Sequence, residues 1–481
     1  MRAFLKKKQR RILLLLVTII LCVLTRTLFL DTSARFIWDE SGDLVRMHEI
    51  FKEKKVTLIG PISQDKINVY GSLTYYMFLP FALLFQFDPI GPVIGAAFYS
   101  LVSIFLLAVI LWKKFGWNLV GSILFLSFIF PFLQAGRWAW NPNLVPFWQI
   151  LSLFVYFSVF LKSKRGIWLF FSGFLQSLAV HNHWYAVFAL AGFSVFVFLT
   201  SPRQKKWCYF LIFLTGVSVG LAPFLVFDLT HPPGLFITRM IYFSPLSLSQ
   251  GAFSMKTFFL RSISLPYQFL FYFFQERLIS WLMLILLLLF FLKERLVKNL
   301  LLLPLFFLFI GLSLIGGEVY QHYFLSGVVF LVIWLFYCKK SVHHSCFQKL
   351  IILLFFVFSI KPSISELLKN DWSTNIAATR KIVMTISSDI ESRNCNLVVV
   401  ASPDLNTKGK RYRDLLFLKG INLLPEDNYR DNECLYVVSS SDEATIRKDP
   451  AYELDRIRNM SATKEWQIKN SIWNVYRFDI K

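Results

Sequence analysis

The chain has 481 residues, of which 56% are hydrophobic and 53 are Phe. Because several apolar runs are long enough to cross a bilayer, this composition excludes a soluble protein and predicts a polytopic membrane protein. The formal net charge of +22 falls almost wholly before residue 361, where 32 Lys and Arg stand against 12 Asp and Glu, while the rest of the chain has 19 against 17. The basic excess is therefore the positive-inside signal of a membrane protein and excludes a nucleic-acid-binding function.

A short acidic stretch follows the first apolar run. That run, Ile12 to Leu30, comes after a basic cluster and resembles a signal peptide, but it lacks a small-residue cleavage site, so we interpret it as a retained signal anchor. Residues 38–43 then read Trp-Asp-Glu-Ser-Gly-Asp and hold three of the 12 carboxylates that precede residue 361. Carboxylates at a bilayer surface are costly, which points to a use for them.

Two geometries are open for this acidic stretch. On a helix, Asp39 and Asp43 would share one face while Glu40 would point about 100° away, so two carboxylates would face one site and the third a separate partner. Alternatively, the stretch is a solvated loop that caps a helix beginning near Leu44. In either geometry it belongs to a first outer loop, residues 31–89, that we expect to be the catalytic loop.

Basic clusters fix the predicted topology. They recur at Lys113-Lys114, Lys162 to Arg165, Arg203 to Lys206, Lys293 to Lys298 and Lys339-Lys340, and each should be cytoplasmic together with the N-terminus. If Ser72 to Phe87 and Ile90 to Leu111 both crossed the bilayer, the first cluster would fall outside. We therefore expect Ser72 to Phe87, a short aromatic-rich run that contains Pro80, to be a juxtamembrane or re-entrant helix on the outer side.

This topology gives about eleven spans within an all-α membrane domain, residues 1–360, and a C-terminus outside the membrane. The predicted spans are 12–30, 90–111, 118–134, 145–161, 166–180, 184–199, 207–227, 268–292, 299–315, 323–337 and 347–360. Eleven of the 12 carboxylates then fall on the outer side, and only Glu294 falls on the inner side. Polar groups gathered on one face of a helix bundle indicate a site at that face.

The predicted outer loops also collect other polar residues. They are Arg137, Asn141, Asn143, His181, His183, Asp228, His231, Glu318 and His322. Arg137 should either snorkel to the interface or pair with a carboxylate. His181 and His183 should either form a metal pair or hydrogen-bond within a tight turn between helices. Glu318 and His322 are four residues apart and would share one helical face at the entry to the tenth span.

The composition turns polar from residue 361, which predicts a small extracytoplasmic α/β domain over residues 361–481. Short strands are expected at Asn396 to Ala401, Cys434 to Ser439 and Trp473 to Phe478, and amphipathic helices near Ile376 to Ile390 and Arg411 to Lys419. The six Cys of the chain show no CxxC or other ligand spacing. The sequence therefore supports neither a disulfide framework nor a zinc ribbon.

Several of these motifs occur together in one known family. The chain resembles the family 39 glycosyltransferases, the protein O-mannosyltransferase-like and bacterial lipid A aminoarabinose transferase-like enzymes of the GT-C superfamily. The resemblance covers the membrane part and rests on Asp39-Glu40, on Tyr70 to Tyr76, on Arg137 with Asn141-Pro142-Asn143, on Phe227 to His231, and on Gln321 to Leu325. Family members commonly have Gly-Pro before the tyrosines, whereas this chain has Gly71-Ser72. Nothing is transferred to the C-terminal domain.

The resemblance implies that a sugar carried on polyprenyl phosphate is transferred, with inversion, to an acceptor hydroxyl of a glycan, lipid or protein outside the membrane. Asp39 would be the general base and Glu40 an orienting partner, while Arg137 and His322 would contact the phosphate. Asp43 and the other outer polar residues would bind substrate. No metal or cofactor beyond the lipid-linked donor would be required, because side-chain cations can stabilise the leaving phosphate.

Two other functions compete with this interpretation. A transporter or flippase of a lipid-linked or small polar substrate would also place ionisable residues in a helix bundle. It predicts charged residues near the middle of spans and repeated halves, and the sequence shows neither. A non-catalytic scaffold for assembly of the cell envelope would leave the acidic stretch without a use.

Overall fold

The computed structural model describes residues 2–62, 69–237, 254–315, 318–337, 346–370, 373–390, 394–400 and 409–480, without the side chains of residues 2–8 and of Val297. The predicted cytoplasmic pair Lys339-Lys340 lies outside the described residues. The chain divides into two compact units. Unit 1 comprises residues 1–28, 57–77 and 94–366, and unit 2 comprises residues 29–56, 78–93 and 367–481. Two segments of the predicted first outer loop thus fold with the C-terminal part of the chain.

Unit 1 is built from helices. Those that lie wholly or partly in it are α1 (Arg2–Thr27), α4 (Leu73–Leu84), α5 (Ile90–Phe115), α6 (Leu119–Ser127), α7 (Phe130–Ala135), η1 (Asn141–Leu144), α8 (Val145–Phe154), η2 (Val155–Phe160), α9 (Leu161–Ser163), α10 (Gly166–Asn182), α11 (Ala186–Thr200), η3 (Arg203–Lys205), α12 (Lys206–Thr230), α14 (Met255–Phe274), α15 (Arg277–Lys293), α16 (Leu296–Asn299), η4 (Leu300–Leu302), α17 (Leu303–Leu314), η5 (Gln321–Phe324), α18 (Leu325–Phe336) and α19 (Cys346–Leu367). A two-stranded antiparallel sheet, β1 (Ile59–Ile62) with β2 (Val69–Gly71), accompanies them.

Four helical segments are long and apolar enough to cross a membrane. Within the described ranges these are Ile90–Phe115, Asn141–Ser163, Arg203–Thr230 and Cys346–Leu367, and several apolar helices of 10–17 residues accompany them. The chain is therefore a multi-pass membrane protein, and the count of about eleven spans stays a prediction. With 12 residues, α4 is about 18 Å long, short of the roughly 30 Å of a bilayer core. Because α18, a predicted span, also has 12 residues, this length does not distinguish a span from the surface helix expected over Ser72 to Phe87, which stays a prediction.

Two predicted spans are interrupted. The span predicted over 268–292 is wrong as a single helix, because α14 ends at Phe274, the next residue, Gln275, has left-handed backbone (φ 52°), and α15 continues at an angle of 119°. The span predicted over 118–134 is likewise divided. There α6 ends at Ser127, and α7 begins after the extended Ile129 with Pro131 in its first turn. Proline is favoured in a first helical turn because its missing N–H has no intrahelical partner there.

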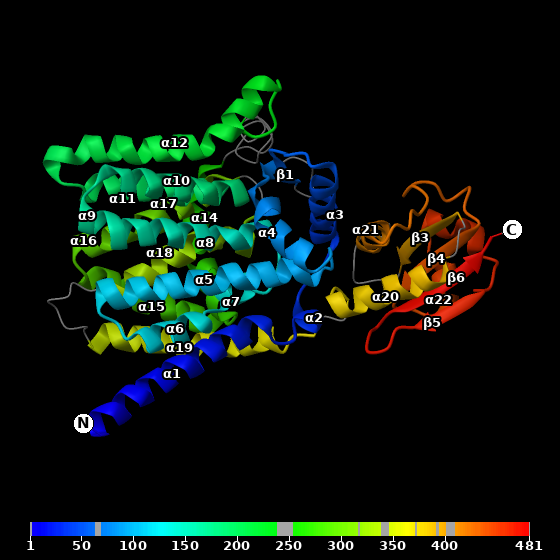
Figure 1. Cartoon of the computed structure of the whole chain (residues 1–481), viewed down its shortest axis with the longest axis horizontal. Helices are drawn as coiled ribbons and strands as arrows, with labels where there is room; N and C mark the ends of the chain where they lie inside the picture. The colour runs from blue at the N-terminus through cyan, green and yellow to red at the C-terminus, as the bar shows by residue number, and fades with distance from the viewer. Residues whose placement is uncertain are drawn as a thin grey trace. The chain divides into compact units, whose positions relative to one another are not determined.

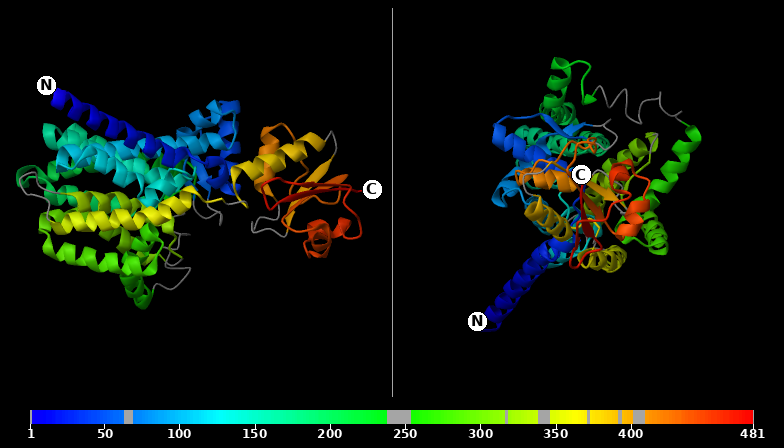
Figure 2. Two further views of the ribbon diagram at one scale, coloured as in Figure 1. Left: turned by 90° about the horizontal axis from the view of Figure 1, so that it is seen from below. Right: turned by 90° about the vertical axis from the view of Figure 1, so that its right-hand side faces the viewer.

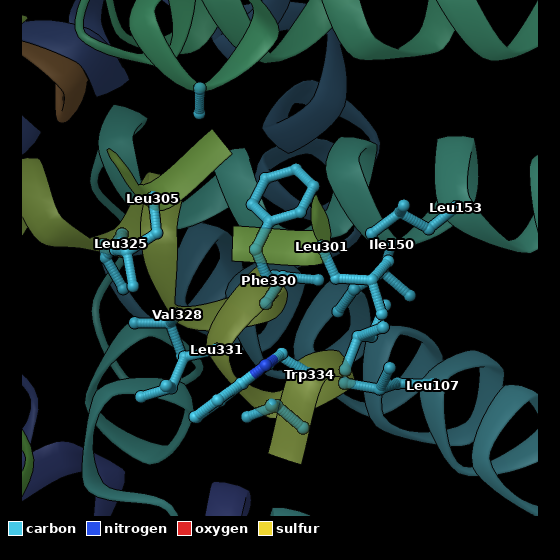
Figure 3. Close-up of a cluster of buried hydrophobic side chains, with 14 of the residues drawn as sticks. Leu107, Ile150, Leu153, Leu301, Leu305, Leu325, Val328, Phe330, Leu331 and Trp334 are labelled. Carbon is cyan, nitrogen blue, oxygen red and sulfur yellow. The ribbon is translucent and has the colours of Figure 1, made fainter. Parts of the chain in front are cut away.

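The core of unit 1 surrounds α18, every residue of which is buried. A helix that is apolar on all sides is expected inside a bundle. Figure 3 shows its side chains Val328, Leu331 and Trp334 in a cluster with Ile150 and Leu153 of α8. Beside this core, α10 lies between α8 and α12 (Figure 1). A Cβ at Gly173 or Gly216 would collide with a carbonyl oxygen of the facing helix, so these glycines permit the close approach of α10 and α12.

Unit 2 combines a four-stranded sheet with helices. Its elements are α2 (Leu30–Ser33), α3 (Trp38–Glu53), α20 (Ile376–Asp389), β3 (Cys395–Val400), α21 (Lys410–Leu418), β4 (Cys434–Ser439), α22 (Glu443–Lys448), η6 (Tyr452–Ile457), β5 (Lys464–Gln467) and β6 (Asn474–Asp479). The strand order is β3-β4-β6-β5, with β3 and β4 parallel and the other pairs antiparallel. Figure 2 shows β6, in red, within this sheet. The predicted strands and helices of a small C-terminal α/β domain are confirmed; β5 was missed because its sequence, Lys-Glu-Trp-Gln, carries no apolar alternation.

A disulfide joins the first two strands of this sheet. Cys395 and Cys434 are register partners on the parallel strands β3 and β4, with Cα atoms 4.6 Å apart. The sequence had supported no disulfide, and on this point the prediction was wrong. Register across a sheet can place two cysteines together from any separation, here 39 residues, so spacing alone did not reveal the pair.

Ion pairs connect α20 to the rest of unit 2. Arg380 donates to Asp31 at 2.7 Å and from Nε to Asp88 at 2.8 Å, so one guanidinium joins α20 to α2 and to the turn before α5. At the other end of α20, Asp389 accepts hydrogen bonds from Lys464 and Arg477. Burial alone would raise the pKa of Asp389, but these hydrogen bonds lower it below its ordinary value. The Arg380 contacts hold both segments of the first outer loop against the C-terminal part of unit 2, and the Asp389 contacts hold α20 against the sheet.

Candidate functional site

The acidic stretch forms the first turn of a helix in unit 2. Helix α3 begins at Trp38, which excludes the loop that was to cap a helix near Leu44. The first-turn N–H groups of a helix lack intrahelical partners, and its dipole favours carboxylates there. Glu40 is buried, and its Oε2 accepts a hydrogen bond from the Ile37 N–H at 2.8 Å. Glu40 therefore closes the helix start, while Asp39 and Asp43 lie on another face, as expected.

Asp39 is partly buried and lies among charged groups of unit 2. Burial raises the pKa of its carboxyl above the ordinary value, while the positive charges of Arg35 and Lys410 oppose the increase. A carboxylate in such surroundings holds a proton more readily than one in water, which suits a group that accepts a proton from a substrate.

The C-terminal part of the chain supplies neighbours that the sequence did not indicate. Ser41 donates from Oγ to Oδ2 of Asp414 on α21 at 2.6 Å, and Lys410 donates to the same oxygen at 2.9 Å. Lys410 and Asp414 are four residues apart on α21 and form an ion pair. The predicted helix began only at Arg411, so the sequence did not indicate this pair. Nor did it indicate their position on α3, because 373 residues separate Ser41 from Asp414.

A cluster of aromatic rings and two histidines lies in unit 1. Tyr70, which precedes α4, stacks on His183 with ring centroids 5.2 Å apart. The His183 ring lies edge-on to His322, also at 5.2 Å, and Trp140 lies 4.4 Å from His322. Burial lowers the pKa of His183 to about 3, so this ring is neutral. Two predicted site residues from different loops, His183 and His322, are therefore brought together.

The other residues of these loops mainly fix the backbone. Nε2 of His181 lies 2.7 Å from the Gly220 carbonyl oxygen, so His181 and His183 have different neighbours. The Asn141 amide donates to the Asn182 carbonyl at 2.7 Å, and the Asn143 amide donates to the Trp138 carbonyl at 2.8 Å. These contacts agree with hydrogen-bonding residues in tight turns. Substrate contact by His181, Asn141 or Asn143 stays a prediction.

Arg137 is a buried residue with 2% of its surface exposed, so the snorkelling interpretation is wrong. Its Nη1 donates to the Thr25 carbonyl at 3.0 Å, and its Nη2 donates to the Leu28 carbonyl at 2.7 Å. Burial lowers the pKa of Arg137 to about 10, and the negative charge of Glu366 opposes this decrease. Both carbonyls lie at the end of α1, so Arg137 satisfies acceptors that a helix end leaves without partners.

Asp228, His231 and Glu318 have positions that the sequence did not reveal. Oδ1 of Asp228 accepts hydrogen bonds from the Leu235 and Phe236 N–H groups at 2.8 and 2.9 Å, which closes the turn after α12. His231 is exposed and stacks on Phe227 at 4.4 Å. Glu318 is exposed and lies outside any helix.

The prediction that Glu318 and His322 share one helical face is wrong. The backbone of Tyr320 is extended (φ −86°, ψ 151°), and η5 begins only at Gln321, so no helix joins the two residues.

The predicted site residues thus fall into two groups, one in each unit. Asp39, Glu40 and Asp43 belong to α3 in unit 2, while His183 and His322 belong to the aromatic cluster of unit 1. Across the described ranges, no three His, Cys, Asp or Glu side chains come close enough to hold a metal ion together. The absence of a metal requirement stays a prediction.

The fold matches that of a known membrane protein. The crystal structure of ArnT from Cupriavidus metallidurans bound to undecaprenyl phosphate superimposes on this chain with a TM-score of 0.56, over 98% of each chain and at 10% sequence identity. At this identity the similarity establishes the shared fold. No family model matches the sequence, and no curated protein matches it.

Proposed function

We propose that the chain is an integral membrane glycosyltransferase of the family 39 type, which moves a sugar from a polyprenyl-phosphate donor to an acceptor hydroxyl on the extracytoplasmic face, with inversion. The observation that carries the proposal is Asp39, a partly buried carboxylate in the first turn of α3 with Arg35 and Lys410 nearby. The ArnT fold supports it, because that protein was crystallised with undecaprenyl phosphate.

In the proposed reaction, Asp39 accepts the proton of the acceptor hydroxyl while the hydroxyl oxygen attacks the anomeric carbon. The bond from that carbon to the phosphate oxygen breaks on the opposite face, and the lipid phosphate leaves with both electrons. Attack opposite to the leaving group inverts the anomeric carbon. The affinity of Asp39 for the proton gains from its partial burial, and its position depends on Glu40, which holds the helix start.

The departing phosphate gains negative charge, which positively charged or hydrogen-donating groups must stabilise. Of the two phosphate contacts that the resemblance implies, we favour His322, which is partly exposed in the aromatic cluster. Arg137 is the weaker candidate, because Nη1 and Nη2 already donate to helix carbonyls. No metal is part of this proposal.

The test is the Asp39→Asn substitution, which keeps the size of the side chain but removes its ability to accept a proton at neutral pH. We expect transfer by the purified protein to fall by about 10²-fold or more. Donor binding, measured separately, should persist. The melting temperature should stay level or rise, because the substitution removes a partly buried charge that serves function rather than stability.

Two matched variants serve as controls. Glu40→Gln keeps an acceptor for the Ile37 N–H and should reduce transfer less than Asp39→Asn does. Asp455→Asn changes an exposed carboxylate and should leave transfer at the wild-type level. If Asp39→Asn binds donor and turns over normally, the mechanism is wrong. If the protein moves the lipid-linked donor from one leaflet of a vesicle membrane to the other without transferring sugar, the flippase alternative is favoured.

A further inference from the structure

Helix α21 brings an ammonium group onto the acidic face of α3. Both helices belong to unit 2. Gly42 follows Asp39 by three residues and is therefore its neighbour on the surface of α3, and a Cβ built on Gly42 would lie 3.6 Å from both Cε and Nζ of Lys410. The ammonium of Lys410 therefore rests over the turn of α3 that carries the two carboxylates.

Two contacts hold the Lys410 side chain there. Its Nζ donates to Oδ2 and Oδ1 of Asp414 at 2.9 and 3.1 Å. Asp414 is itself fixed to α3, because the Ser41 hydroxyl donates to its Oδ2 at 2.6 Å. The side chain of Asp414 is 14% exposed and that of Lys410 is 40% exposed, so the anchor is largely buried while the ammonium stays within reach of solvent.

We propose that Lys410 is a positioning residue for the Asp39 carboxylate: anchored through Asp414 and Ser41, its positive charge keeps Asp39 ionised and sets the pH above which the carboxylate can accept a proton. This inference rests on the proposed function of Asp39 as general base. It gives the C-terminal part of the chain, to which the family resemblance assigns nothing, a part in the reaction.

Several charged groups face Asp39, and their signs fix the expected direction. Arg35 and Lys410 are positive and favour the ionised carboxylate. Asp43 on the same helical face and Asp414 on α21 are negative, while Glu40 is turned to the Ile37 N–H. Removing the charge of Lys410 leaves Arg35 in place, so the pKa of Asp39 rises further without Asp39 becoming inert. Activity should therefore begin at a higher pH.

The experiment measures sugar transfer by the full-length protein as a function of pH. Lys410→Met preserves side-chain length without charge and should shift the acid limb of the profile upward by about one pH unit, with the plateau at higher pH within about twofold of the wild type. Lys410→Arg should restore the wild-type limb, because it keeps the charge. Lys419→Met, at the exposed end of the same helix, should change nothing. Lys410→Gln provides a second neutral variant if Lys410→Met does not fold.

A second measurement is independent of turnover. Carbodiimide activates protonated carboxyl groups, so its attachment of an amine to Asp39, quantified by peptide mass spectrometry across the same pH range, follows the ionisation of Asp39. If Lys410→Met shifts this profile while no variant, wild type included, transfers sugar, the role of Lys410 stands and the proposed function fails. If the wild type transfers sugar and neither profile moves in Lys410→Met and Lys410→Gln, the inference is overturned.

Discussion

Arg137 illustrates how a buried charge can serve the fold while it resembles a site residue. In a bilayer, no water is present to satisfy the carbonyls that a helix end leaves without intrahelical partners. Arg137 donates to the carbonyls of Thr25 and Leu28 at the end of α1. Arg26, at the end of α1, donates in turn to the Ser127 carbonyl at the end of α6 at 2.6 Å. The two arginines therefore fasten α1 to its neighbours.

The first expectation at this scale is that Arg137→Ala destabilises the protein by about 2 to 4 kcal/mol, because two hydrogen bonds from a charged donor are lost and buried carbonyls are left without them. Arg137→Lys should recover part of the loss, since an ammonium cannot reproduce the fork of a guanidinium. The measurement is thermal unfolding of the purified protein in detergent. Arg165→Ala, which removes an exposed arginine, should melt with the wild type. An Arg137→Ala protein that melts normally but fails to bind donor would instead place Arg137 at the phosphate.

Sequence reasoning at the residue scale found Asp39, Glu40 and Asp43, because carboxylates are scarce in an apolar chain and three of them fall within six residues. It could not find Lys410 and Asp414, whose importance depends on where α21 packs. Nor could it assign Arg137 to helix carbonyls, since every residue carries a carbonyl and only the fold selects the acceptor. The prediction for Glu318 failed because a four-residue spacing puts two side chains on one face only inside a helix. The extended backbone of Tyr320 prevents a helix from joining Glu318 to His322.

At the scale of elements, the pair of parallel strands in unit 2 has a covalent link. Because disulfides persist in oxidising compartments, the bond between Cys395 and Cys434 fits the predicted extracytoplasmic position of the C-terminal domain. Both cysteines are buried in the sheet. The link closes a loop of 39 residues that includes α21, the helix that carries Lys410.

Replacing both cysteines by alanine should lower the stability of this part of the chain by about 4 kcal/mol, the loop-closure value for such a separation. The expected readout is faster cleavage by trypsin within residues 395–434, followed by mass spectrometry of the fragments, in the variant and in wild-type protein treated with a reductant. Cys208→Ala, at an exposed free cysteine, is the matched control and should be cleaved at the wild-type rate. Equal cleavage of the double variant and the control would show that the bond contributes little.

Elements were predictable where hydropathy or alternation is strong. The bounds of α10, α12, β3 and β4 lie within a few residues of the expected ones, because long apolar runs and short β-branched runs each favour one structure. Interruptions were harder to foresee. Hydropathy averaged over a long window does not reveal the break at Gln275-Glu276. There two polar residues, the first with left-handed backbone, separate α14 from α15.

At the scale of the whole molecule, the topology is the open expectation. A reporter fused after Lys114, at the end of α5, should report a cytoplasmic location because Lys113-Lys114 is the first basic cluster after the acidic loop. A reporter fused at Lys481 should report an extracytoplasmic location. The measurement is the paired activity of a reporter that is active only in the cytoplasm and one that is active only outside. If the Lys114 fusion is found outside, Ser72 to Phe87 crosses the bilayer and the predicted arrangement of spans is wrong.

The hydrogen bonds of Arg26 and Arg137, which join the end of α1 to later parts of the chain, can form only after those parts have been synthesised. The Ser127 carbonyl that accepts from Arg26 lies 101 residues later in the chain. At roughly 5 to 20 residues per second, a ribosome needs on the order of 5 to 20 seconds to supply this acceptor after Arg26 has been made. If α1 crosses the bilayer as predicted, the Arg26 guanidinium has only nearby groups to bind during that interval, such as the Thr25 hydroxyl and lipid headgroups. The contact between the end of α1 and the end of α6 can therefore form only after a much later part of the chain has been translated.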